Sequence, residues 1–143
     1  MKEKAKGWVF FAERDMLMAE AAISDSRLTG QVAFHSQQTI EKYFKAYLTE
    51  FDFAFPKIHD LLKLYDFIKT IKDWNIDEKM LFDINRIYSE SRYPSNIGLL
   101  DGQLPSSENA KEILNFAKKI ENIFKEDLGE ANIKKDSDLK EHL

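Results

Sequence analysis

Three groups of polar residues carry the chemistry that this sequence could support. The first group falls in one predicted helix, at spacings of three and four residues that place its members on one helix face or its edge: His35, Gln38, Glu41, Lys42 and Lys45. An imidazole, an amide and two ammonium groups on one face could bind a phosphate or a nucleotide. The same pattern is typical of a solvated helix face with a Glu41–Lys45 ion pair, so the residues alone leave both interpretations open.

The second group lies in the segment from Pro56 to Leu61 and contains His59 and Asp60 at a predicted helix start. Either side chain could accept hydrogen bonds from the unpaired N–H groups of the first helical turn, and Asp60 also favours the positive end of the helix. Alternatively, His59 could act beside an anion, because histidine changes charge near neutral pH. Both roles remain open.

The third group ends another predicted helix. Asn85, Ser89 and Arg92 share a helix face, and Tyr93 and Pro94 follow directly. An arginine at the carboxyl end of a helix is favourable for the helix dipole alone. An arginine beside an aromatic ring, at the start of a long loop, is also suited to holding a phosphate and stacking on a base.

Composition excludes several other classes of site. The chain has 143 residues, three His, no Cys and a net charge of −4. It therefore has no disulfide, thiolate zinc site or cysteine nucleophile. Glycine-rich phosphate loops, serine-hydrolase elbows and metal-binding histidine pairs do not occur, so we expect no metal and no cofactor. No run approaches the ~20 apolar residues of a membrane span, and the start of the chain does not resemble a secretory signal. We expect a soluble cytoplasmic protein.

Apolar periodicity predicts the elements that must position these groups. Apolar residues recur at helical spacing in five segments, separated by the few Gly and Pro: about 7–27, 30–51, 58–71, 78–91 and 106–128. Asp77 and Ser106 or Ser107 are typical helix caps, and Gly129 suits a helix end. Residues 94–105 resemble a long loop. We expect one all-α domain, an up-and-down bundle of about five helices over residues 1–128, and a polar, disordered tail over residues 129–143.

The apolar faces of the first, second and last predicted helices are wide for one small bundle. A homodimer formed through helix faces would cover the excess apolar surface, and we therefore expect one.

Considered together, these segments resemble the HEPN domain family (higher eukaryotes and prokaryotes nucleotide-binding domain), of the short prokaryotic stand-alone type, over roughly residues 5–128. The order and spacing of the shared segments carry the resemblance: Trp8–Asp15 with Ala19-Glu20, Ala33–Gln38 with Glu41-Lys42 and Lys45-Ala46, Pro56–Leu61, and Tyr88 with Ser91–Pro94.

The resemblance implies a helical bundle, commonly a homodimer, that binds nucleotides or RNA. Short members are often encoded beside a minimal nucleotidyltransferase and act with it as a two-component or toxin–antitoxin system. Many members are metal-independent ribonucleases that carry Arg, four to six residues, then His. Here seven residues separate Arg27 from His35, and no His follows Arg86 or Arg92 until His142. The sequence thus lacks the ribonuclease motif, and we do not expect a conventional HEPN ribonuclease.

The sequence-based hypothesis is a HEPN-like homodimer that binds a nucleotide or RNA phosphate and acts with a separate nucleotidyltransferase. Lys42, Lys45 and Arg92 would hold phosphate, and Tyr93 would stack on a base. Gln38 or His35 would donate hydrogen bonds, while Glu41 would orient Lys45 or a ribose. One alternative is a metal-independent ribonuclease toxin with an altered site that uses His35 or His59. A second is an interaction module whose only ligand is protein.

Overall fold

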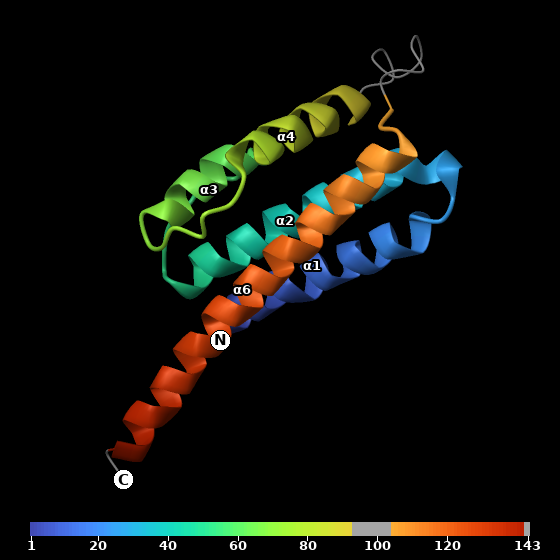
Figure 1. The fold of residues 1–143 in the computed structure, drawn as a ribbon. Coiled ribbons are helices and arrows are strands. Elements are labelled where there is room, and N and C mark those ends of the chain that lie inside the picture. The colour runs from blue at the N-terminus through green and yellow to red at the C-terminus, as the bar shows by residue number, and fades with distance from the viewer. Residues whose placement is uncertain (93–103, 142–143) are drawn as a thin grey trace.

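The computed structural model describes residues 1–92 and 104–141, with side chains for residues 1–87 and 104–129. Within these ranges the chain is helical and contains no strand, which confirms the predicted all-α bundle. The described residues form five α-helices and one short 3₁₀ turn: α1 Glu3–Ala22, η1 Ser26–Leu28, α2 Thr29–Glu50, α3 Leu61–Lys69, α4 Glu78–Arg92 and α6 Ser107–Glu141. Figure 1 labels the α-helices.

Helix α2 is the centre of the bundle. It runs antiparallel to α1 and also contacts α3, α4 and α6, so its side chains meet neighbours on several sides (Figure 1). Alanines buried on the inner face of α1, including Ala12 and Ala19, let the two helix backbones approach closely. The polar residues of α2 are therefore held by the best-packed element of the fold.

Aromatic rings fill the core on the far side of α2. Tyr43 and Tyr47 of α2 pack on Phe124 of α6, with ring centroids 4.9 Å and 6.5 Å apart. Tyr47 also meets Trp74, from the segment between α3 and α4, edge to face at 4.8 Å. These contacts fix both α6 and the α3–α4 connection against α2.

Several predicted helix ends are confirmed by their caps. Asp77 accepts hydrogen bonds from the backbone N–H groups of the first turn of α4, and the Ser106 hydroxyl accepts from Asn109 N–H at the start of α6. Asp60 caps α3 by accepting from Lys63 N–H, so α3 begins at Leu61 and not near residue 58 as predicted.

Other boundaries differ from the sequence-based ones. Helix α1 begins at Glu3, earlier than predicted. It ends at Ala22, because Asp25 caps a separate 3₁₀ turn by accepting a hydrogen bond from Arg27 N–H. Helix α6 passes through Gly129 and ends at Glu141, whereas the sequence predicted an end near Leu128. Gly129 does not adopt the left-handed conformation of a helix-ending glycine, and the residues after it include good helix formers such as Ala, Leu, Lys and Glu.

The division into a bundle and a disordered tail stays a prediction, and most of the predicted 94–105 loop lies outside the described residues.

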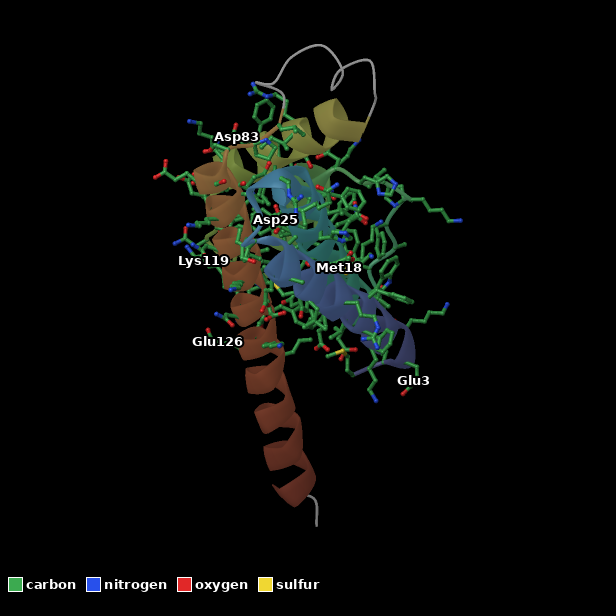
Figure 2. The ribbon with its side chains drawn as sticks, turned by 90° about the vertical axis from the view of Figure 1, so that its right-hand side faces the viewer. Glu3, Met18, Asp25, Asp83, Lys119 and Glu126 are labelled. Carbon is green, nitrogen blue, oxygen red and sulfur yellow. The ribbon has the colours of Figure 1, made fainter. Side chains whose placement is uncertain are left out.

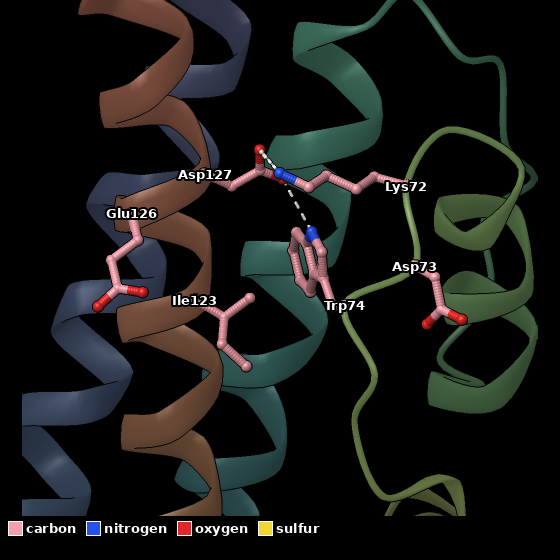
Figure 3. Close-up of a pocket in the computed structure, with 6 residues that line it drawn as sticks. All are labelled: Lys72, Asp73, Trp74, Ile123, Glu126 and Asp127. Atoms are coloured by element: carbon pink, nitrogen blue, oxygen red, sulfur yellow. Dashed lines mark hydrogen bonds and ion pairs between the residues drawn. The ribbon is translucent and has the colours of Figure 1, made fainter.

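A buried carboxylate joins α6 to the α3–α4 connection. Asp127 accepts hydrogen bonds from Trp74 Nε1 at 2.8 Å and Lys72 Nζ at 3.0 Å, and the Tyr47 hydroxyl also bonds to it. Lys72, Trp74 and Asp127 also line a hollow of about 250 Å³, and Figure 3 draws the residues around it. Burial raises the pKa of Asp127, but the hydrogen bonds from Tyr47, Trp74 and Lys72 outweigh burial and hold the pKa below its usual value of 3.8.

Because this pKa is depressed in the folded state, ionised Asp127 stabilises the fold above the unfolded-state pKa, and the stabilisation is lost as the pH falls through the folded-state value. We predict that Asp127→Asn lowers the free energy of unfolding at pH 7 by about 1–3 kcal/mol. The deficit should shrink near pH 3. Urea unfolding at both pH values measures it. The matched control is Glu126→Gln, an exposed neighbour that lines the same hollow; its effect should stay within about 0.5 kcal/mol. Equal stability of Asp127→Asn and wild type at pH 7 would contradict the assignment.

Candidate functional site

Two clusters of charged side chains lie along α2, and each is built on one buried carboxylate. The Asp15 cluster consists of Asp15, His35 and Lys42. The Glu41 cluster consists of Gln37, Glu41, Lys45 and His59. Each cluster thus joins one carboxylate to one lysine and one histidine.

The Asp15 cluster links α1 to α2. Asp15 Oδ1 lies 2.9 Å from His35 Nδ1, and Asp15 Oδ2 accepts a hydrogen bond from Lys42 Nζ. Asp15 is placed there by its position on the inner stripe of α1, three residues after Ala12 and four before Ala19. All three side chains are largely buried, with exposed fractions of 12% for Asp15 and 21% for both His35 and Lys42.

Aromatic rings cover the cations of both clusters. The Lys42 ammonium lies 5.8 Å from the centre of the Phe11 ring, and the Lys45 ammonium lies 5.3 Å from that of Trp8. Phe34 meets the His35 ring edge to face at 5.1 Å. These contacts reduce access of water to the ammonium groups and strengthen their pairing with the carboxylates.

The Glu41 cluster links α2 to the segment before α3. The Glu41 carboxylate lies 3.0 Å from His59 Nδ1 and accepts a hydrogen bond from Lys45 Nζ at 3.2 Å. Gln37 Nε2 donates to the same carboxylate at 3.4 Å, from one turn earlier on α2. Glu41 is 2% exposed, so protein groups replace water around its charge.

The backbone around His59 is held from both sides. The His59 carbonyl accepts from Gln37 Nε2 at 3.5 Å. After it, Asp60 and Leu61 exchange hydrogen bonds with the Asn85 amide of α4, at 2.9 Å and 3.0 Å. The His59 side chain is nevertheless 57% exposed. An exposed imidazole is therefore fixed in orientation by a buried carboxylate through Nδ1.

This arrangement has a simple electrostatic consequence. With neutral imidazoles, each cluster carries one negative and one positive charge and is neutral overall. Protonation of either histidine gives its cluster a net charge of +1. The clusters can therefore attract an anion such as a phosphate, and an imidazole whose Nδ1 is bonded to a carboxylate can exchange a proton through Nε2.

The predicted site residues occupy different environments. Gln38 donates to the Gln37 side chain at 2.6 Å, at the edge of the Glu41 cluster. Lys45 was expected to hold phosphate, but its side chain is only 7% exposed and paired with Glu41. His35 and His59 are bound to different carboxylates, Asp15 and Glu41. The side chain of Arg92 and the whole of Tyr93 lie outside the described residues.

Sequence reasoning missed two members of these clusters, Asp15 and Gln37. Asp15 carried a usable signal, because it is an acidic residue on an otherwise apolar helix stripe and so had to find a buried cation. Gln37 carried no such sequence signal, because its neighbour Gln38 was already assigned to the predicted polar face.

Among the described residues, no group of three or more histidine or acidic side chains is placed to hold a metal ion. No helix in the described part of the chain is long and apolar enough to span a membrane.

The fold and these clusters define an all-helical bundle whose central helix carries a buried polar site. The HEPN domain model matches residues 5–128, most of the chain, and the protein belongs to the HEPN domain family. Comparison with curated proteins gave no match, and comparison with solved structures gave none either.

The Glu41 cluster makes a direct stability prediction. Glu41→Gln leaves the buried Lys45 ammonium without its counter-charge, so we expect a loss of about 3 kcal/mol in the free energy of unfolding. Adding Lys45→Met removes the unpaired charge and should restore at least about 1 kcal/mol. Glu20→Gln, at an exposed position of α1, is the control and should change little. Additive losses in the double variant would show that the two groups are not coupled.

Proposed function

We propose that this HEPN-domain protein binds the phosphate of a nucleotide or RNA at the exposed edges of the two clusters on α2. The observation that carries the proposal is the pair of histidines, His35 and His59, each fixed through Nδ1 by a buried carboxylate that also binds a lysine. When protonated, each imidazole can donate from Nε2 to an anion, and its fixed orientation limits the loss of conformational entropy on binding. Lys42 is the more accessible lysine. Lys45 is assigned to holding Glu41 and does not contact the ligand.

The proposal retains Arg92 and Tyr93 as further phosphate and base contacts. Their support is the sequence, where an arginine and an aromatic residue adjoin at the end of α4. Family membership supports two partners: a second copy of the chain, and a separate minimal nucleotidyltransferase with which the protein would form a two-component or toxin–antitoxin system.

Substitution of His59 tests the ligand site most cleanly. Asparagine can keep the donor to Glu41 in place of Nδ1, but it lacks the ε nitrogen, whereas glutamine places a nitrogen farther out. We predict that His59→Asn weakens ATP or short-RNA binding about tenfold, which corresponds to about 1.4 kcal/mol. His59→Gln should weaken binding less. Isothermal titration calorimetry measures both.

The control for this series is Lys118→Ala, which removes an exposed charge from α6. Its affinity should equal that of the wild type. Arg92→Ala should also weaken binding about tenfold if Arg92 contacts phosphate. Unchanged affinity in both His59→Asn and Arg92→Ala would refute the site. Failure of the wild type to bind any nucleotide or RNA would favour an interaction module whose only ligand is protein.

A second candidate function is metal-independent RNA cleavage, which the Glu41–His59 contact favours. A carboxylate bonded to Nδ1 holds the imidazole in the tautomer that can accept a proton at Nε2. On this hypothesis the protein cleaves RNA in EDTA, His59→Ala abolishes cleavage, and expression arrests growth. No cleavage of a varied RNA pool would exclude this function and leave phosphate binding as proposed.

A further inference from the structure

A second hollow, of about 350 Å³, lies between the start of α3 and α4. Its lining combines an aromatic ring, an aliphatic side chain, a carboxylate, an amide and a guanidinium: Phe82, Leu62, Asp60, Asn85 and Arg86. In Figure 2 the label of Asp83, the residue after Phe82, marks this part of α4. The hollow adjoins His59, because Asp60 follows His59 directly in the chain. Apolar walls with a few polar groups, at this volume, are typical of a small-molecule site.

Phe82 gives this hollow an accessible aromatic wall. Its side chain is 53% exposed, and Leu62 of α3, which lines the same hollow, is only partly buried. Every nucleobase has a flat π-face that can stack on an aromatic side chain. The apolar part of the hollow is therefore suited to a planar ring such as a nucleobase.

Hydrogen bonds within the protein orient the Asp60 carboxylate. Its Oδ1 accepts from Lys63 N–H at 3.2 Å and from Asn85 Nδ2 at 2.9 Å. The Asn85 amide is fixed in turn, because its Oδ1 accepts from Leu61 N–H at 3.0 Å. Both hydrogen bonds to Asp60 use Oδ1, so within the described part of the chain Oδ2 is left for a donor of a ligand. Asn85 is thus a positioning residue, and Asp60 offers an oriented acceptor.

An oriented acceptor beside a stacking surface distinguishes between nucleobases. Adenine and cytosine carry an exocyclic amino group that donates hydrogen bonds, whereas uracil, like thymine, has a carbonyl acceptor in place of the cytosine amino group. The amino group can donate to Asp60 Oδ2, but a carbonyl placed there would meet a second acceptor and be disfavoured. Arg86 lies one helical turn after Phe82 and brings a positive charge that suits the phosphates of the same ligand.

We infer that this hollow binds the base of a nucleotide, with the ring stacked on Phe82 and an exocyclic amino group donating to Asp60 Oδ2. The inference rests on the proposed function, in which His59 contacts the phosphate, and it adds to the base contact proposed for Tyr93. It also specifies the ligand class, because nucleotides of cytosine or adenine bind more tightly than those of uracil.

CTP and UTP test this preference, because their bases have rings of the same size and differ where one has an amino group and the other a carbonyl. We expect the wild type to bind CTP about tenfold more tightly than UTP in isothermal titration calorimetry. Asp60→Asn should abolish or reverse the preference. Asparagine keeps the oxygen that caps α3, which it does as well as aspartate, and places an amide donor where Oδ2 was. A CTP preference that persists in a folded Asp60→Asn variant would overturn the inference.

Substitution of Phe82 separates the base site from the phosphate site. Phe82→Ala should weaken CTP binding at least about fivefold and leave the affinity for tripolyphosphate, which has no base, unchanged. The matched control is Phe10→Ala, which removes a ring of similar exposure, 47%, from α1 and should change neither affinity. Equal binding of CTP and UTP by the wild type, or CTP binding unaffected by Phe82→Ala, would overturn the base site and leave phosphate binding as proposed. Failure of CTP, UTP and tripolyphosphate to bind would overturn both.

Discussion

Burial of two carboxylates beside α2 is the constraint on which the rest of this structure depends. As whole residues, Asp15 and Glu41 are only 9% and 2% exposed, and a charge in such surroundings is stable only when it is paired and hydrogen-bonded. Each carboxylate obtains one lysine and one histidine. The carboxylates and their partners together come from three parts of the chain, so this pairing fixes α1, α2 and the segment before α3 relative to one another.

The same pairing explains why polar residues occupy the central helix of the bundle. Helix α2 packs aromatic residues such as Tyr43, Phe44 and Tyr47 into the core and directs its charged residues toward α1 and the His59 segment. Helix α1 has two different faces as a result. Its inner face supplies alanines and Asp15 to α2, while its outer face exposes Phe10, Leu17 and Met18. The inner face builds the candidate site.

Much of this fold could be predicted from sequence, because helices and their caps are local. The five helical segments and the caps at Asp77 and Ser106 follow from patterns within a few residues of each other, and the HEPN resemblance follows from the order and spacing of such segments along the chain. The candidate site was predicted only in part. Spacing on α2 placed His35 and Lys42 on one face, and both bind Asp15, whereas Gln38 contacts Gln37 at the edge of the Glu41 cluster. Pairing with Asp15 and His59 depends on contacts 18 to 27 residues apart in the chain. Exposure of Lys45 was overestimated for the same reason, since its burial depends on Trp8.

The central claim is that a buried carboxylate accepts a hydrogen bond from Nδ1 of His35 and another from Nδ1 of His59, so that each ring, when protonated, can donate from Nε2 to a phosphate. Long-range ¹H–¹⁵N correlation spectra of the imidazole rings test it directly, and a chain with three histidines gives few signals to assign. The account predicts that Nδ1 carries the proton in both rings at neutral pH, and that adding ATP or a short RNA shifts the His59 signals. Averaged tautomers in both rings, unchanged by either ligand, would contradict it.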